Sequence, residues 1–185
     1  MNKLATVSAL AALAIGGQAM ADDLSYHYVD AGLILGDSPG GNDGKGLGVA
    51  GSVDLPQLYT NATGIGGLRY IDFDFGNLLQ ASLGLGFHWP IASVVDFNGG
   101  LSLGLNKFSG SDTDIGFILN AGVRATPFAP EWELDGGLRH TDIGLYEDTS
   151  VVLGARYTFR PGMSAGVELD SGDIDFWTLS VRWEM

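Results

Sequence analysis

Apolar and polar residues alternate with a period of two along most of the chain. In the stretch DIGFILNAGVRA, from Asp114 to Ala125, apolar side chains occupy every second position, and Ile118 is the one large apolar residue on the polar side. A strict period of two is typical of a β-strand with one apolar and one polar face. Ten segments show this pattern: 24–35, 45–55, 59–71, 78–88, 93–106, 113–125, 131–142, 148–159, 163–170 and 174–185.

The connections between these segments alternate in character. LPQLY, HWPIA, TPFAPE and RPGM carry proline and aromatic residues, whereas GDSPGGNDG, DFDFGN, NKFSGSDT, DIGLYEDT and DSGD are rich in Gly, Asp and Ser. This alternation predicts an up-and-down sheet with tight turns at one end and longer acidic loops at the other. Eight strands are the alternative, but they would require a loop of more than about 20 residues. No segment of that length lacks the strand pattern.

The sizes of the side chains distinguish a transmembrane barrel from a soluble one. The polar face carries many glycines, whereas the apolar face carries nearly all the Leu, Phe and Trp residues. Because the inner face of a narrow barrel is crowded, the small and polar face is predicted to line the lumen. The apolar face then meets lipid, where unpaired strand edges cannot be satisfied. The predicted fold is an all-β, closed, antiparallel up-and-down transmembrane β-barrel of ten strands.

Aromatic residues gather near both ends of the apolar faces, as the two membrane interfaces require. One group lies near the proline-containing turns: Phe87, Trp89, Phe97, Phe128, Trp132, Tyr157, Phe159 and Trp183. The other group lies near the acidic segments: Tyr70, Phe73, Phe75, Phe108, Tyr146 and Trp177. Two girdles of aromatic side chains are therefore expected.

Composition and charge narrow the classes of partner. Residues 1–21 are predicted to be a signal peptide, with the basic start MNK, an apolar stretch and an AMA cleavage site ending at Ala21. Residues 22–185 then form the barrel domain. The formal net charge of -13 and the lack of a basic cluster argue against nucleic acid as a partner. The absence of cysteine excludes disulfides and thiolate metal sites.

The C-terminal hairpin SVVLGARYTFRPGMSAGVELDSGDIDFWTLSVRWEM resembles the paired closing strands of the small Gram-negative outer-membrane β-barrel proteins, of the OmpA-like and OmpX-like type. The resemblance implies a monomer in the outer membrane, with both termini in the periplasm and the acidic loops outside the cell. It also implies outer-membrane lipids, lipopolysaccharide and the barrel assembly machinery as partners. Family members commonly end in Phe or Trp, whereas this chain ends in Met185, two residues after Trp183.

Motifs that could carry catalysis fit their chemistry poorly. GLSLG (100–104) and GMSAG (162–166) match the G-x-S-x-G pattern, but that nucleophile needs a strand-to-helix elbow. Both serines instead fall within predicted strands. His140 and Asp142 could orient an imidazole as a base, yet no activated serine adjoins them. His27 and His88 are predicted to be interface residues, so no catalytic residue, no cofactor and no enzymatic activity are expected.

Acidic residues of the loops could supply oxygen ligands to Ca²⁺ or Mg²⁺. They are Asp112, Asp114, Asp170, Asp173 and Asp175. Their spacing fits no closed coordination loop, so they are interpreted as solvated loop acids and no metal site is predicted.

The predicted inner face carries arginines among carboxylates. Consecutive antiparallel strands are expected to pair symmetrically about the centre of the loop that joins them. This reflection places Asp96 across from Arg124, Arg124 across from Glu133, and Asp135 across from Arg156. Opposite charges on neighbouring strands approach closely, and an arginine can bridge two carboxylates. These five residues are predicted to form a charge network that blocks the periplasmic half of the lumen.

Three functions remain open on the sequence, in this order. The first is a structural or interaction barrel with a polar, largely plugged lumen. The second is a narrow porin-like channel for ions or very small solutes. The third is an outer-membrane enzyme that modifies lipid A or phospholipid.

Overall fold

The computed structural model describes residues 24–38 and 42–185, so the predicted signal peptide lies outside the described residues. Ten strands make up the fold: β1 (Tyr28–Ser38), β2 (Asn42–Asp54), β3 (Ala62–Phe73), β4 (Gly76–Ala92), β5 (Val95–Phe108), β6 (Thr113–Ala125), β7 (Trp132–Ile143), β8 (Tyr146–Arg160), β9 (Met163–Ser171) and β10 (Asp175–Glu184). Within the described ranges, no helix is long and apolar enough to cross a membrane. The predicted number of strands is confirmed.

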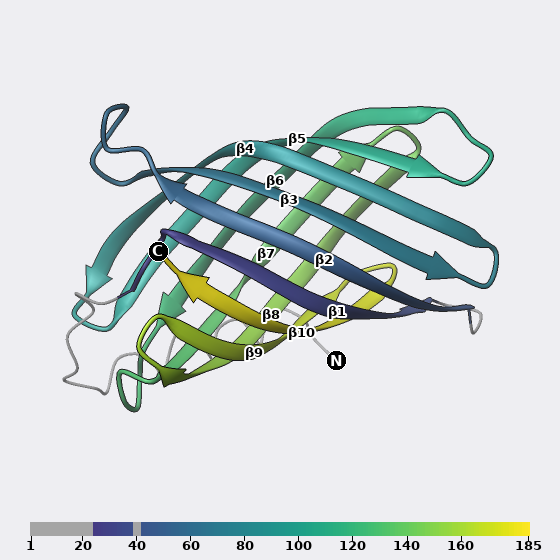
Figure 1. Ribbon diagram of the computed structural model, residues 1–185. Helices are drawn as coiled ribbons and strands as arrows, with labels where there is room; N and C mark the ends of the chain where they lie inside the picture. Colours follow the sequence, from purple (N-terminus) through teal and green to yellow (C-terminus); the bar gives the residue numbers. More distant parts are fainter. Residues whose placement is uncertain (1–23, 39–41) are drawn as a thin grey trace.

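The sheet closes on itself to form a barrel (Figure 1). Each strand pairs antiparallel with its neighbours in sequence, and β1 pairs with β10 from Tyr28–Glu184 to Asp37–Asp175. We call the end where β1 begins and β10 finishes the terminal end, and the opposite end the hairpin end. Closure leaves no strand edge unpaired, which is the condition for placing a sheet in lipid.

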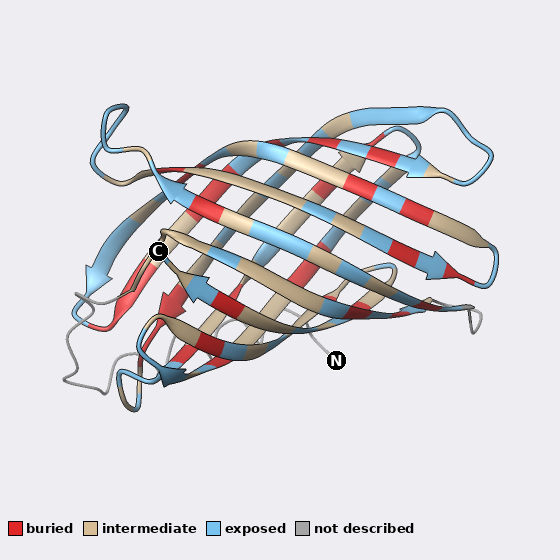
Figure 2. Ribbon diagram, in the orientation of Figure 1, coloured by how far each residue is buried: buried red, intermediate tan, exposed pale blue. Residues whose placement is uncertain are grey.

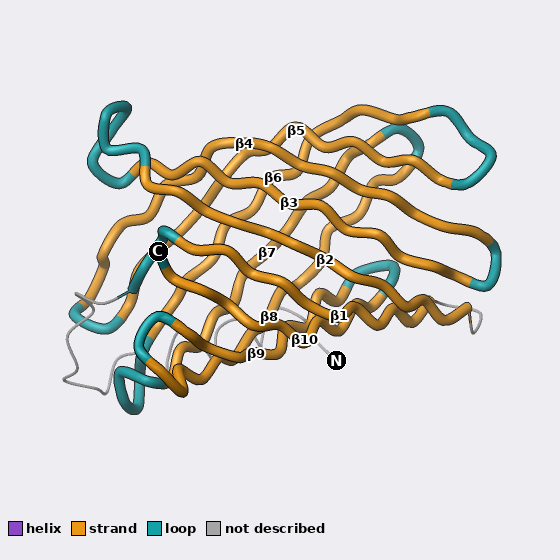
Figure 3. Tube along the Cα trace, in the orientation of Figure 1, coloured by secondary structure: helices purple, strands orange, loops and turns teal. Residues whose placement is uncertain are grey.

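The lengths of the connections differ from the prediction. The terminal end has the two longest described connections, residues 55–61 and 126–131, and the four described connections at the hairpin end are residues 74–75, 109–112, 144–145 and 172–174 (Figure 3). The expectation of longer loops at the acidic end is therefore wrong. Glycines at positive φ, such as Gly110 and Gly144, make tight turns there, because glycine adopts this conformation without steric cost.

Burial alternates along the strands as the sequence predicts (Figure 2). Leu103 and Leu119 are 70% and 49% exposed on the outer face, whereas Ser102 is 7% exposed on the inner face. The outer surface of the closed barrel is thus apolar, and the buried polar and charged side chains lie on the inner face. The barrel crosses a membrane, and its place is the outer membrane, where closed antiparallel barrels of this type reside.

Glycines on the inner face let the strands curve tightly. A Cβ atom added at Gly116 would overlap the backbone carbonyl oxygen of Asp142 on the neighbouring strand. One added at Gly104 would overlap the end of the Ile143 side chain. Small inner residues therefore belong to the closed geometry itself, as the sizes of the side chains indicated.

The girdle at the terminal end is confirmed for seven of its eight predicted residues, and the eighth, Phe97, is half-buried beside Phe87. There Phe87, Trp89, Phe128, Trp132, Tyr157, Phe159 and Trp183 are exposed on the outer face. At the hairpin end Tyr70, Phe75 and Trp177 are exposed, but Phe73 is 4% exposed, Phe108 packs beside it, and Tyr146 lines the lumen. The girdle prediction is wrong for these last three residues, because the alternation along their strands places them at positions that face inward.

Candidate functional site: the lumen

Charged side chains cross the lumen near the terminal end. Glu133, at the start of β7, is 9% exposed and accepts hydrogen bonds from two arginines. Arg124 of β6 donates from Nη2 to Oε2 at 2.6 Å and from Nε to Oε1 at 3.2 Å. Arg182 of β10 donates from Nη1 to Oε1 at 3.1 Å. Glu133 is therefore shared by two guanidinium groups from different walls of the barrel.

Asp30 of β1 extends this arrangement. Its Oδ2 accepts hydrogen bonds from Arg156 Nη2 at 2.8 Å and from Arg182 Nε at 3.3 Å. We call the series Arg124, Glu133, Arg182, Asp30 and Arg156 the charge chain. Its members come from β6, β7, β10, β1 and β8, and β7 does not pair with β10. The charge chain thus spans the lumen, and burial of its charges is tolerable because each one is paired.

The structure brings the predicted network together only in part. Arg124 lies across from Asp96 on the β5 side, as predicted, but across from Asp135 on the β7 side rather than Glu133. Arg156 lies across from Glu133 rather than Asp135. Both predicted registers are wrong by two residues, because the β6–β7 connection, residues 126–131, and the β7–β8 turn, residues 144–145, are each centred differently from the simple reflection. A shift of two keeps every side chain on its face, so Arg124 still reaches Glu133 diagonally.

Two predicted members stand apart from the charge chain. Asp96 pairs with Arg124 in register, but its carboxylate accepts a hydrogen bond from the Tyr26 hydroxyl instead. Asp135 forms no ion pair within the described part of the chain and, with Glu168, lines a second cavity of about 180 Å³. Asp30 was missed by the sequence analysis, although its alternation with Ala31 and Val29 places it on the inner face.

The mouth of the lumen at the terminal end holds Tyr26, which precedes β1. Its ring stacks on His88 with centroids 3.9 Å apart, and the Arg124 Cζ atom lies 4.6 Å from the Tyr26 centroid. Its hydroxyl donates to Asp96 Oδ2 at 3.2 Å, and burial raises the pKa of the phenol, so the proton stays in place. The prediction that His88 is an interface residue is wrong, because His88 faces the lumen beneath Tyr26.

An apolar cluster fills the lumen near the hairpin end. It contains the buried residues Ile34, Ile71, Phe73, Leu78 and Phe176, with Phe108 and Ile174 packed against them. The sequence analysis did not predict it, and it assigned Phe73 and Phe108 to a girdle. We call this group the apolar cluster.

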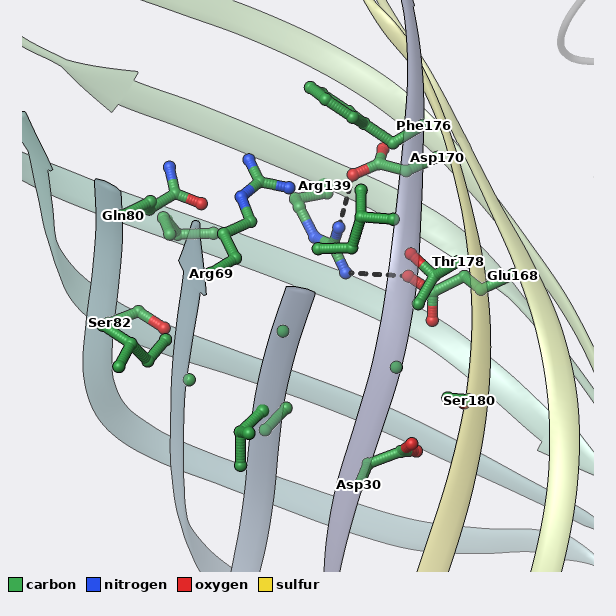
Figure 4. A pocket seen from close by; sticks show the side chains of 18 of the residues that line it. Asp30, Arg69, Gln80, Ser82, Arg139, Glu168, Asp170, Phe176, Thr178 and Ser180 are labelled. Atoms are coloured by element: carbon green, nitrogen blue, oxygen red, sulfur yellow. Dashed lines mark hydrogen bonds and ion pairs between the residues drawn. The ribbon is translucent and has the colours of Figure 1, made fainter. Parts of the chain in front are cut away.

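A cavity of about 350 Å³ lies along the lumen (Figure 4). Arg139 projects into it from β7 and forms ion pairs with Asp170 and, at 3.6 Å, with Glu168. Arg69 projects from β3 and lies 4.9 Å from the Phe176 ring centroid, without an ion pair in the described residues. Hydroxyl and amide side chains add to the lining, among them Gln80, Ser82, Ser102, Asn120, Thr178 and Ser180, and apolar side chains such as Ile65 and Ile118 make up the rest. The cavity therefore has a mixed polar and apolar lining and is large enough to hold several water molecules.

The residues considered for catalysis lie apart from one another. Ser102 and Ser164, the serines of the two G-x-S-x-G matches, are buried within β5 and β9. His140 Nδ1 lies 2.9 Å from Thr149 Oγ1, and its ring lies beside Phe117. The described residues contain no group of three or more His, Cys, Asp or Glu side chains suited to a metal ion.

No protein-family model matches the sequence, and no curated protein matches it. Among solved structures, the KdgM porin is similar at a TM-score of 0.49 and 9% identity, covering 85% of this chain and 99% of that one. Neisserial surface protein A is similar at a TM-score of 0.44 and 16% identity, covering 87% and 98%. Outer-membrane phospholipase A from Escherichia coli is similar at a TM-score of 0.41 and 10% identity, covering 86% of this chain and 97% of that one. Similarity at this level assigns no activity to the chain.

Proposed function

We propose that this outer-membrane barrel has a structural or interaction role and that its lumen is plugged. The observation that carries the proposal is the charge chain, in which Glu133 and Asp30 hold three arginines across the lumen. Paired, buried charges resist displacement, because breaking one pair leaves an uncompensated charge behind. The apolar cluster adds a second obstruction toward the hairpin end.

The outside of the barrel fits this role. The outer face offers apolar side chains to outer-membrane lipid, and the aromatic girdle of the terminal end suits a membrane interface. We propose lipids, lipopolysaccharide and the barrel assembly machinery as partners of a monomeric protein. The short described connections of the hairpin end offer little surface to a protein partner, which favours a structural role. Membership of the OmpA-like and OmpX-like type is part of the same proposal and rests on the C-terminal hairpin.

A narrow channel is the second candidate. The cavity of about 350 Å³ favours it, because rearrangement of the obstructions at either end would connect this space with water. Enzymatic activity is not part of the proposal, since Ser102 and Ser164 lie buried in strands and His140 contacts Thr149.

Planar-bilayer recording of the refolded protein tests the proposal. The plugged barrel is expected to show no steady conductance, and a steady open level in the wild type would establish the channel instead. Mass spectra of lipid A and phospholipid from cells that produce the protein are expected to be unchanged. A new lipid product would overturn the non-enzymatic role.

Replacing Arg124 by alanine is expected to weaken the plug. Glu133 keeps Arg182, but it loses its closest ion pair, so the free energy of unfolding should fall by about 2–4 kcal/mol. Carboxylates left at the terminal mouth should give any resulting leak a preference for cations. Urea titration in lipid vesicles and reversal potentials across a KCl gradient measure the two effects. Arg160→Ala is the control, since Arg160 is exposed at the same end; an anion-selective leak would contradict the prediction.

A further inference from the structure

We infer that the segment Leu24–Tyr26 is a latch that closes the terminal mouth of the lumen, and that His88, Asp96 and Arg124 form its receptor site. The occupant of this site is the chain's own Tyr26. The inference rests on the proposed plugged lumen and adds to it a part that can move, because the latch lies outside the strands.

The receptor site lies on the part of the wall remote from the start of β1. His88, Asp96 and Arg124 belong to β4, β5 and β6, whereas β1 pairs with β2 and β10. Tyr26 therefore reaches across the mouth rather than along the neighbouring wall. Arg124 Nη1 also donates to the backbone carbonyl oxygen of Ser25 at 3.1 Å, which holds the backbone of the latch as well as its side chain.

The receptor site fits a tyrosine in particular. The imidazole of His88 stacks nearly parallel to the ring, at an interplanar angle of 11°, and the Arg124 guanidinium makes a cation–π contact with the ring. Asp96 Oδ2 accepts a hydrogen bond from the Tyr26 hydroxyl group, and no other hydrogen bond to its carboxylate is present within the described residues. A phenylalanine would keep both ring contacts and lose the hydrogen bond, whereas an alanine would lose all three.

The latch can open without loss of the barrel. It contributes few contacts compared with the ladders of the ten strands, and segments of this kind open locally at low free-energy cost. The charge chain lies deeper than the latch, so opening exposes the second cavity, which Arg124, Glu133, Arg182 and Asn120 line. The latch thus controls whether water-soluble molecules at the terminal end reach the charge chain.

The chain has no cysteine, so a single introduced thiol reports access to the lumen. Asn98→Cys places that thiol in the lining of the second cavity, across from His88 and two residues from Asp96 on β5. The rate of modification by a small charged thiol reagent is measured on the refolded full barrel. Tyr26→Ala is expected to raise this rate about tenfold, because it removes a stack, a cation–π contact and a hydrogen bond. Tyr26→Phe should raise it less.

Tyr59→Ala is the matched control, since Tyr59 is exposed in the connection 55–61 at the same end. It should leave the rate unchanged. A double-mutant cycle with His88→Ala separates a latch from general loosening: if His88 acts through Tyr26, the double variant reacts no faster than Tyr26→Ala alone. Equal rates for the wild type and Tyr26→Ala, or additive effects in the cycle, would overturn the latch. Steady conductance of the wild type would instead overturn the plugged lumen, so the two failures are distinct.

Discussion

Replacing Glu133 by alanine is expected to lower the free energy of unfolding by about 3–5 kcal/mol, the range found when one partner of a buried ion pair is removed. Glu133 is the one carboxylate that joins Arg124 to Arg182. Its loss would leave Arg124 without an ion pair and Arg182 with Asp30 alone. Urea titration of the barrel in lipid vesicles, followed by tryptophan fluorescence, measures the change.

The control for this substitution is Glu147→Ala. Glu147 is an exposed carboxylate of β8 at the hairpin end, and its removal should change the stability by about 0.5 kcal/mol or less. Glu133→Gln keeps the shape and loses the charge, so it should recover only a small part of the loss. If Glu133→Ala were as stable as Glu147→Ala, the charge chain would not hold the lumen together.

Leu103→Arg is expected to destabilise the barrel by about 2–4 kcal/mol, the cost of an arginine on the lipid face near the middle of the bilayer. Leu103 is 70% exposed on the outer face, midway along β5, and pairs across the sheet with Leu83 and Phe117. Equilibrium folding titrations into lipid vesicles measure the change.

Leu103→Ala separates the charge from the lost side chain. Because a lipid-facing alanine leaves no cavity in a protein core, its effect should be much smaller than that of the arginine. The difference should shrink in thin bilayers, where the arginine reaches water more readily. Equal stability of the two variants would mean that this face does not meet hydrocarbon.

The alternation of residues was sufficient to predict the strands and their faces. A register error of two residues does not exchange the two faces of a strand. Arg124 and Glu133 were therefore correctly predicted to face inward, although both registers of β7 were wrong. The register between β5 and β6 was predicted correctly. The register between β7 and β8 was not, because their turn, residues 144–145, lies near the start of the acidic segment rather than at its centre. The longer connection 126–131 offers several possible centres.

Contacts across the lumen could not be predicted in this way. Reflection about a loop relates only strands that follow each other, whereas Arg182 and Glu133 meet from β10 and β7. That pairing depends on barrel closure and on strand stagger, which no local pattern encodes. Tyr26 was included in a predicted strand, whereas β1 begins at Tyr28, so the position of Tyr26 in the mouth was not predicted.

The pairing of β1 with β10 has a consequence for the route by which the molecule folds. Every other pair of neighbouring strands is a hairpin whose partners are close in sequence, so those contacts form with little loss of loop entropy. The β1–β10 pair instead joins the first strand to the last, and a backbone hydrogen bond from Met185 N to the His27 carbonyl oxygen at 3.0 Å extends it. Its formation is the one step of high contact order, and we expect it to limit the folding rate. Until β10 pairs with β1, the other nine strands form an open sheet whose two edge strands have unpaired backbone groups. This open sheet is the state most prone to aggregation.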